Sequence, residues 1–238
     1  MYKRQITDYD LPNTNNAAWA PLPIGDRLWF VAGAPVLNEL GDFVWDMFSG
    51  DARERFPTLH VFDPVSETFS NTYDTLSAPT KGTVQLPYIW FSSNPLTVIN
   101  ERTMTNTGLL YAVDTRDGTF IGEWELCSTI SAPYPLGERL WVGCSEDGSD
   151  LWSFTGDPPQ EERHYTQVGI NPWEPIEHGD DIWFTFRDSN TAARFDAQTG
   201  DLLDQYAIVS DPGPPFLYRG QVWVYGIRDG VLQRLSGG

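Results

Sequence analysis

Short stretches in which apolar and polar residues alternate recur along this chain, and residues 174–208 show the pattern most plainly. They read EPIEHGDDIWFTFRDSNTAARFDAQTGDLLDQYAI. Alternation with a period of two, bounded by Gly, Asn and Asp, is typical of strands joined by tight turns. The segment predicts four strands, through 175–176, 180–186, 191–197 and 201–208, with a DAQTG turn before the last one.

Two landmarks repeat at regular spacing. An aromatic strand carries a tryptophan, and a strand ending in a polar turn follows it. The tryptophans are Trp29, Trp90, Trp141, Trp183 and Trp223, and the turns lie at Asp63, Asp114, Thr155, Asp196 and Ser236. From each turn to the next tryptophan the steps are 27, 27, 28 and 27 residues, whereas from each tryptophan to its own turn they are 34, 24, 14, 13 and 13. The distance from a turn to the next tryptophan is therefore nearly constant, and only the connection from a tryptophan to its own turn varies in length.

This spacing predicts a repeated unit of four antiparallel strands, which we call a to d. The tryptophan lies on b, and the polar turn joins c to d. Surface loops absorb insertions at small entropic cost. The two long tryptophan-to-turn steps, of 34 and 24 residues, therefore indicate insertions in the b–c loops of the first two units. The predicted fold is all-β, a β-propeller with five repeat units visible. The expected blades are 17–76, 77–126, 127–168, 169–208 and 209–238.

Residues 1–5, MYKRQ, do not fit the repeat. They match the translation of the end of a sequencing adapter, so we expect them to be an artefact and the natural protein to continue upstream. Residues 6–12 are then predicted to be an outer strand d. That strand either completes the fifth unit and closes a five-bladed ring, or belongs to a further blade of a larger propeller.

Composition narrows the range of partners. The net charge is −18, from 15 Lys and Arg against 33 Asp and Glu. A field of that sign repels nucleic acid and anionic membrane surfaces and favours solubility or cationic partners. The longest apolar runs have the length of strands, so no membrane insertion is expected.

The chain has two cysteines. Cys127 is predicted to begin a d–a crossover and Cys144 to end a strand b. These positions fall on the same face of a propeller, which allows a disulfide, but two free thiols fit the sequence equally.

The two b–c insertions, 34–57 and 94–107, supply most of the candidate ligand-binding residues. Both insertions leave the same face, and binding residues concentrate on loops held by a rigid scaffold. The candidates are Asp42, Trp45, Asp46, Arg53, Arg55, Asn100, Glu101 and Arg102. The alternative is a lid that covers its own hydrophobic residues. A short helical turn is predicted through 43–48.

The b–c loops of the later units bring further charged pairs to the same rim. These pairs are 146–147, 187–188 and 228–229, and they add Arg187 and Arg228 to the ligand-binding candidates. A ring of alternating acid and base could bind a polar ligand or a cation. Solvated turn residues are the other interpretation.

The histidines give little support for catalysis. His60 is predicted on a strand c, His164 on a strand d, and His178 in an a–b turn, so they do not converge. No metal site is predicted, and no nucleophile, zinc or phosphate-binding motif occurs in the sequence. Neither a catalytic residue nor a cofactor is assigned.

The repeats resemble those of the virginiamycin B lyase (streptogramin lyase) family and of NHL-like propellers, on the strength of GDDIWFT, ARFDAQTG and GDRLWFV. LYAVDTRDGTFIGEW also resembles the repeat of pyrroloquinoline-quinone (PQQ) propellers. The resemblance implies a propeller fold. The lyase family places histidines and a glutamate for magnesium ahead of the Trp strand in Pro-His segments. The matching segments here are APLPIG, APYPLG, WEPIEHG and PPFLYRG, which contain no Pro-His pair, so no catalytic residue is carried over.

Two functions follow from these observations. The first is a non-enzymatic propeller scaffold, secreted or periplasmic, that binds a protein, glycan or small ligand on the face carrying the insertions. The alternative is a lyase-like or quinoprotein-like enzyme with its site in the central channel.

Overall fold

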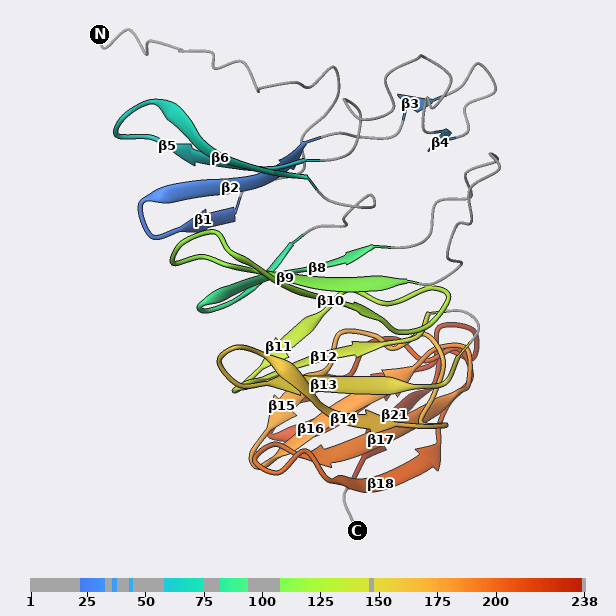
Figure 1. The fold of residues 1–238 in the computed structure, drawn as a ribbon. Helices are drawn as coiled ribbons and strands as arrows, with labels where there is room; N and C mark the ends of the chain where they lie inside the picture. Colours follow the sequence, from blue (N-terminus) through green and yellow to red (C-terminus); the bar gives the residue numbers. More distant parts are fainter. Residues whose placement is uncertain are drawn as a thin grey trace, which may run out of the picture. The chain divides into compact units, whose positions relative to one another are not determined.

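The structure is a computed structural model. It describes residues 22–32, 36–37, 43–44, 58–74, 82–93, 108–145 and 148–236. Every helix or strand assigned in these residues is a β-strand, which confirms the all-β prediction (Figure 1). The chain divides into two compact units, residues 1–79 and residues 80–238.

The first unit contains one four-stranded antiparallel sheet. Its strands are β1 (Leu22–Ile24), β2 (Arg27–Ala32), β5 (Thr58–Asp63) and β6 (Thr68–Asp74), in that order across the sheet. Between β2 and β5, β3 (Val36–Leu37) pairs with β4 (Phe43–Val44). The helical turn predicted to begin at Phe43 is therefore wrong at its first two residues, because their backbone pairs with a neighbouring strand. Residues 45–48 lie outside the described residues.

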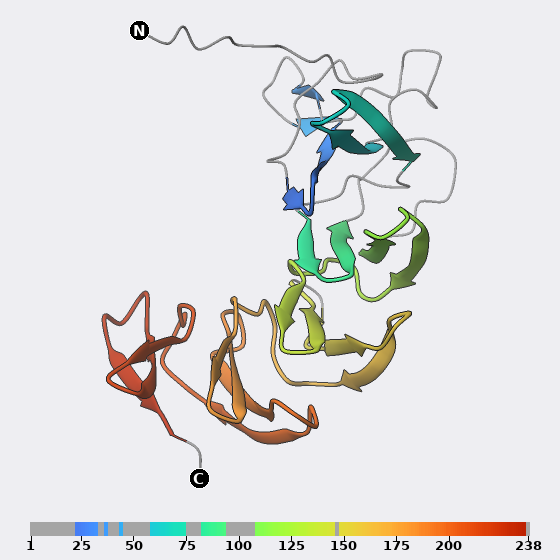
Figure 2. The ribbon, with the colours of Figure 1, turned by 90° about the vertical axis from the view of Figure 1, so that its left-hand side faces the viewer.

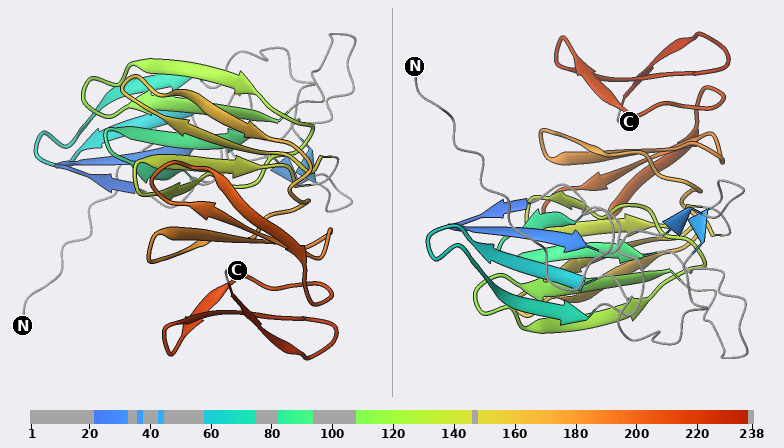
Figure 3. Two further views of the ribbon diagram at one scale, coloured as in Figure 1. Left: turned by 90° about the horizontal axis from the view of Figure 1, so that it is seen from below. Right: turned by 90° about the horizontal axis from the view of Figure 1, so that it is seen from above.

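The second unit contains four antiparallel sheets, which follow one another in chain order in Figure 2, from green to red. Figure 3 shows the last two sheets, in orange and red, side by side. The first sheet is β7 (Thr83–Gln85), β8 (Tyr88–Ser93), β9 (Leu109–Asp114) and β10 (Phe120–Glu125). The second is β11 (Tyr134–Leu136), β12 (Arg139–Gly143), β13 (Leu151–Thr155) and β14 (Gln160–Tyr165). The third is β15 (Ile176–His178), β16 (Asp181–Phe186), β17 (Thr191–Asp196) and β18 (Leu202–Ala207). The fourth is β19 (Phe216–Tyr218), β20 (Gln221–Tyr225) and β21 (Leu232–Leu235).

The repeated tryptophans hold consecutive sheets together. Trp90 of β8 packs with Leu140 and Val142 of β12 in the next sheet. Trp141 packs in the same way with Ile182 and Phe184, and Trp183 with Val222 and Val224. Trp90, Trp141 and Trp183 are at most 2% exposed. Burying so large an apolar surface in each repeat stabilises the stack of sheets, as in a propeller.

The Asp turns fix the hairpin between strands c and d. Asp196 Oδ1 accepts hydrogen bonds from the backbone N–H groups of Gln198 and Thr199, at 2.9 and 2.7 Å. Gly200 follows with φ at +74°, in the left-handed region that glycine enters without steric cost. The Asp114 turn has the same local chemistry: Asp114 Oδ1 accepts a hydrogen bond from the Arg116 N–H at 2.8 Å, and Gly118 has φ at +79°.

In the third sheet, the observed strand boundaries agree with those predicted for residues 174–208 to within two residues. Strand a of the third sheet is β15, one residue later than predicted at its start, so that His178 ends a strand instead of lying in a turn. The long connection between β8 and β9 is a b–c loop, as the tryptophan-to-turn spacing predicts.

Candidate functional site

One edge of the second unit is built from b–c loops and d–a crossovers. Each crossover makes an isolated antiparallel bridge to the residue that follows or ends strand b: Ile130 to Cys144, Pro172 to Phe186, and Pro212 to Gly226. We call this edge the b–c rim. Its described residues are 128–131, 143–145, 170–173, 186–190, 209–213 and 226–230. The backbone pairing gives these loops a fixed position relative to the sheets.

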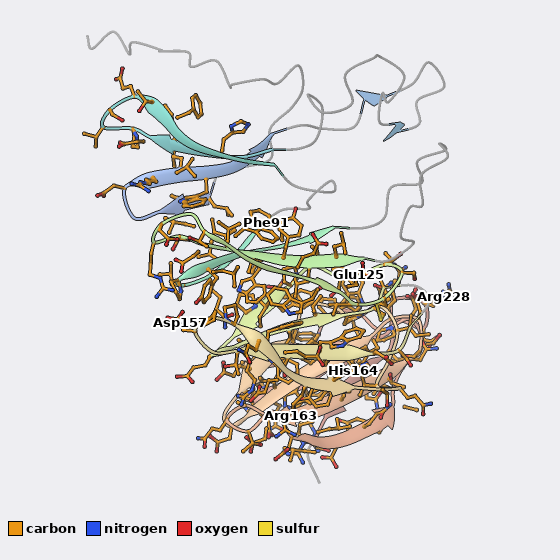
Figure 4. The ribbon with its side chains drawn as sticks, viewed as in Figure 1. Phe91, Glu125, Asp157, Arg163, His164 and Arg228 are labelled. Atoms are coloured by element: carbon orange, nitrogen blue, oxygen red, sulfur yellow. A yellow bond between two sulfur atoms is a disulfide. The ribbon has the colours of Figure 1, made fainter. Side chains whose placement is uncertain are left out.

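Two of the predicted candidates converge on one carboxylate at the rim. Arg187 Nε donates a hydrogen bond to Asp211 Oδ1 at 2.8 Å, and Arg228 Nε lies 3.4 Å from Asp211 Oδ2. The Asp211 side chain is 12% exposed, whereas Arg187 is 43% and Arg228 is 77% exposed. Figure 4 labels Arg228 at the outer limit of the second unit. The structure thus pairs the two arginines through a largely buried carboxylate and leaves most of the Arg228 side chain in solvent.

The ion pair fixes the protonation state of the acid. The hydrogen bond from Arg187, and then the positive charges of Arg187 and Arg228, lower the pKa of Asp211 below its ordinary value, against the opposing effect of burial. The same hydrogen bond raises the pKa of Arg187. Both groups are therefore charged near neutral pH, and the carboxylate holds the arginines by charge-assisted bonds.

Asp211, whose carboxylate contacts Arg187 and Arg228, has an unusual backbone conformation. Its φ is +48°, in the left-handed region that Asp and Asn enter more readily than other non-glycine residues. The Asp211 N–H donates to Asn190 Oδ1 at 2.7 Å, and its carbonyl accepts from Ile227 N at 2.9 Å. Contacts on both sides thus hold this conformation, and strain of this kind is often found at binding sites.

The preceding crossover repeats the arrangement. Asn171 has φ at +60° and precedes a proline, as Asp211 does. Its amide donates to Asp188 Oδ2 at 3.0 Å, and its carbonyl accepts from Arg187 N at 3.0 Å. The Arg187–Asp188 loop is therefore held from two crossovers at once.

Trp173 supplies the aromatic group of the rim. Its indole N–H donates to the Pro212 carbonyl at 2.6 Å, and the Arg187 guanidinium carbon lies 5.9 Å from its ring centroid. Arg187 thus contacts an aromatic ring and a carboxylate together. Arg and Trp side chains are enriched among the residues that contribute most to protein interfaces.

The other predicted ligand-binding residues lie outside the described part of the chain. They are Asp42, Trp45, Asp46, Arg53, Arg55, Asn100, Glu101 and Arg102, together with the charged pair 146–147. Their assignment to the site stays a prediction.

The two cysteines meet at the rim. Cys127 and Cys144 form a disulfide with their Cα atoms 6.0 Å apart, so that it joins the crossover after β10 to the end of strand β12. A Cβ added to Gly148 would lie 2.7 Å from the Cys144 sulfur, which explains the small residue there. Of the two alternatives left by the sequence, the structure contains the bonded form.

The histidines of the second unit lie apart from the rim arginines. His164 of β14 stacks on Trp152, with ring centroids 4.6 Å apart, and its Nε2 lies 2.8 Å from Asp150 Oδ2. His60, in the first unit, is fully buried, and burial lowers its pKa. Among the described residues, no three His, Cys, Asp or Glu side chains gather as a metal site would require. No helix among these residues could cross a membrane.

Comparison with known proteins supports the fold alone. No protein-family model matches the sequence, and no curated protein is similar to it. A functionally unknown protein from Desulfotomaculum acetoxidans matches with a TM-score of 0.51 at 12% identity, over 91% of this chain and 68% of that one. BamB from Moraxella catarrhalis matches with a TM-score of 0.45 at 15% identity, over 89% and 67%. The computationally designed Ika4 protein matches with a TM-score of 0.48 at 13% identity, over 69% and 94%.

Sequence reasoning missed Asp211 and Trp173. A signal for the first was present. When the units are aligned on Pro175 and Pro215, an Asn-Pro pair (171–172) and an Asp-Pro pair (211–212) fall at the same step of the repeat. Two short polar residues that tolerate positive φ, each before a proline, indicate a special backbone position.

Proposed function

We propose that this β-propeller is a non-enzymatic scaffold that binds a protein, glycan or small ligand at the b–c rim, the edge from which the insertion 94–107 leaves. The observation that carries the proposal is the pairing of Arg187 and Arg228 with Asp211, which holds one arginine in place and leaves the other 77% exposed. A guanidinium that is anchored on one side and exposed over most of its surface can meet a ligand with little loss of conformational freedom.

The chemistry of the rim favours a ligand that carries hydrogen-bond acceptors. A guanidinium presents five N–H donors in a planar fork, which matches a carboxylate in a bidentate manner. Arg228 Nε lies 3.4 Å from Asp211 Oδ2, and the side chain is 77% exposed. Trp173 and Arg187 lie beside it as a planar aromatic and cationic surface. An acidic side chain of a partner protein or an acidic sugar of a glycan meets these requirements.

We place this scaffold in a secreted or periplasmic setting. The support is the Cys127–Cys144 disulfide, because disulfides persist in oxidising compartments and are rare in the cytosol.

A screen on arrays of acidic and neutral glycans and peptides tests the proposal. Wild-type protein is compared with the double variant R187A/R228A. Arg163→Ala serves as the matched control, because Arg163 is also a partly exposed arginine paired with a carboxylate, at 3.0 Å from Asp201, but lies outside the rim.

We expect wild-type protein and R163A to bind acidic probes, and the double variant to lose at least about tenfold in signal, as the removal of two charged interface contacts implies. Equal binding by all three proteins would show that the rim is not the site. Absence of binding by folded wild-type protein would overturn the proposal.

A further inference from the structure

The last sheet of the second unit has fewer strands than the other three. Among the described residues it contains β19, β20 and β21, whereas each of the other sheets has a fourth strand, d, beside strand c. Strand c of the last sheet is β21, which pairs with β20 on one side. We call its other side, where no described strand pairs, the β21 edge. An open edge presents backbone N–H and C=O groups that can pair with another extended segment.

The composition of β21 suits such pairing. Outer strands commonly carry charges that discourage the addition of a further strand, as β14 does with the sequence QEERHY. In contrast, β21 has the sequence LQRL, in which Arg234 is the single charged residue. Leu232, at its start, is 60% exposed.

The third sheet shows what lies beside strand c elsewhere. Arg194 of β17 lies directly opposite Trp183 in the ladder. Asp204 of β18 lies opposite Arg194 on the other side, and Arg194 Nε donates to Asp204 Oδ2 at 2.9 Å. A second carboxylate oxygen, Asp181 Oδ2, lies 3.1 Å from Arg194 Nη1. These contacts leave the Arg194 side chain only 16% exposed.

Arg234 holds the same place in the last sheet. It lies on β21, directly opposite Trp223. Gln221 stands where the third sheet has Asp181, and the strand that would supply the other carboxylate is not among the described residues. Arg234 is exposed, and no carboxylate in the described part of the chain forms an ion pair with it. The β21 edge therefore presents a cation where the equivalent strand meets an aspartate.

A second position specifies the added strand further. In β18, Tyr206 follows the aspartate by two residues and lies opposite Ala192. Its ring packs edge-on against Trp183, with centroids 6.5 Å apart. Leu232 of β21 is the equivalent of Ala192. An apolar or aromatic residue opposite Leu232 would therefore cover an exposed apolar side chain.

Residues 6–12 of this chain do not supply both groups. If Asp10 lies opposite Arg234, the residue two places later, opposite Leu232, is Pro12. If Asp8 lies opposite Arg234, that residue is Asp10, a charge against an apolar side chain. Neither alignment reproduces the pairing of β17 with β18, which favours a strand from another protein.

We propose that the β21 edge accepts an extended segment of a partner protein as a fourth, antiparallel strand, with an acidic residue opposite Arg234 and, two residues later, an aromatic or apolar residue opposite Leu232. The backbone pairing supplies affinity, and the two side chains set the register. Neither Arg187 nor Arg228 takes part, so the failure of this proposal leaves that of the b–c rim standing, and the reverse.

Two peptides test the proposal. One has the sequence of residues 201–208, DLLDQYAI, and the other has lysine at the place of Asp204. Each carries a fluorophore and is titrated with the full chain, with fluorescence anisotropy as the readout. We expect the aspartate peptide to bind about tenfold more tightly, because opposite charges attract across a strand pair and like charges repel. The net charge of −18 favours the lysine peptide, so only a local contact explains the expected preference.

Charge reversal locates the binding. We expect Arg234→Glu to reverse the preference, so that the lysine peptide binds more tightly. Arg163→Glu is the matched control, because Arg163 is a partly exposed arginine on β14, the outer strand of another sheet. That variant should keep the preference of wild-type protein. Circular dichroism establishes that each variant is folded.

Four results would overturn the proposal. Folded wild-type protein would fail to bind the aspartate peptide, or would bind both peptides equally, or Arg234→Glu would keep the wild-type preference. The fourth is sedimentation of wild-type protein as a dimer that Arg234→Glu dissociates, since a second copy of the chain would then occupy the β21 edge.

Discussion

Arg187 Nε lies 2.8 Å from Asp211 Oδ1, although 24 residues separate the two and they belong to the loop after β16 and the crossover before β19. The contact joins a b–c loop of one sheet to the chain entering the next. Because Arg228 also approaches Asp211, one carboxylate ties together loops of two consecutive sheets. The b–c rim is therefore a connected structure with defined side-chain positions.

The acid sensitivity of this connection can be measured. The folded-state pKa of Asp211 is depressed, so its contribution to stability is present above the unfolded value of about 3.9 and is lost as the pH falls through the lower folded value. We expect Asp211→Asn to lower the free energy of unfolding near pH 6 and to have little effect near pH 2. Urea denaturation of both proteins across this range provides the measurement.

Asp180→Asn is the control for that experiment, because Asp180 lies in an exposed turn away from the rim arginines. Its free energy of unfolding should stay close to that of wild type, because the side chain lies on the surface away from the rim. A constant difference between wild type and Asp211→Asn from pH 6 to pH 2 would contradict the assigned ion pair.

Two tryptophans at the same repeat position should differ in their contribution to stability. Trp183 is 2% exposed between two sheets, so we expect Trp183→Ala to cost about 3–5 kcal/mol, as for a large aromatic removed from a core. Trp223, on the last sheet, is only partly buried, and Trp223→Ala should cost less. Free energies of unfolding of the two variants give the comparison. Wild-type stability of Trp183→Ala would show that the strand register is wrong.

Reduction of the disulfide should destabilise the second unit. Cys127 and Cys144 are 17 residues apart, and closing a loop of about that length lowers the entropy of the unfolded chain by an amount worth about 3 kcal/mol. We expect the Tm to fall when reductant is added, with two thiols becoming titratable in denaturant. The double variant Cys127→Ala/Cys144→Ala should have a lower Tm than oxidised wild-type protein, and adding reductant should not change it. An unchanged wild-type Tm after complete reduction would contradict this prediction.

The repeat could be predicted from sequence because it depends on local chemistry and constant spacing. Trp141 and Trp183 each lie on the second strand of a sheet, and Asp196 forms the turn, as the steps of 27 or 28 residues require. Short stretches with two-residue periodicity fix which side chains face the neighbouring sheet. The fold followed from these features without any family match.

The candidate site depends on a feature that the spacing of the repeat does not encode. Arg187 and Arg228 could be placed on one rim, but their common partner Asp211 depends on a positive φ in the crossover. This is a tertiary effect of a single residue.

The measurement that tests the central claim most directly is a calorimetric titration of the protein with two matched oligosaccharides, one ending in glucuronate and one in glucose. Salt of about 0.15 M reduces long-range repulsion by the acidic surface, since the Debye length is then about 8 Å. If the b–c rim accepts acidic ligands, wild-type protein will bind the glucuronate probe at least about tenfold more tightly, and Arg228→Ala will lose that preference. Equal binding of both probes by wild-type protein, or an unchanged preference in Arg228→Ala, would contradict the account.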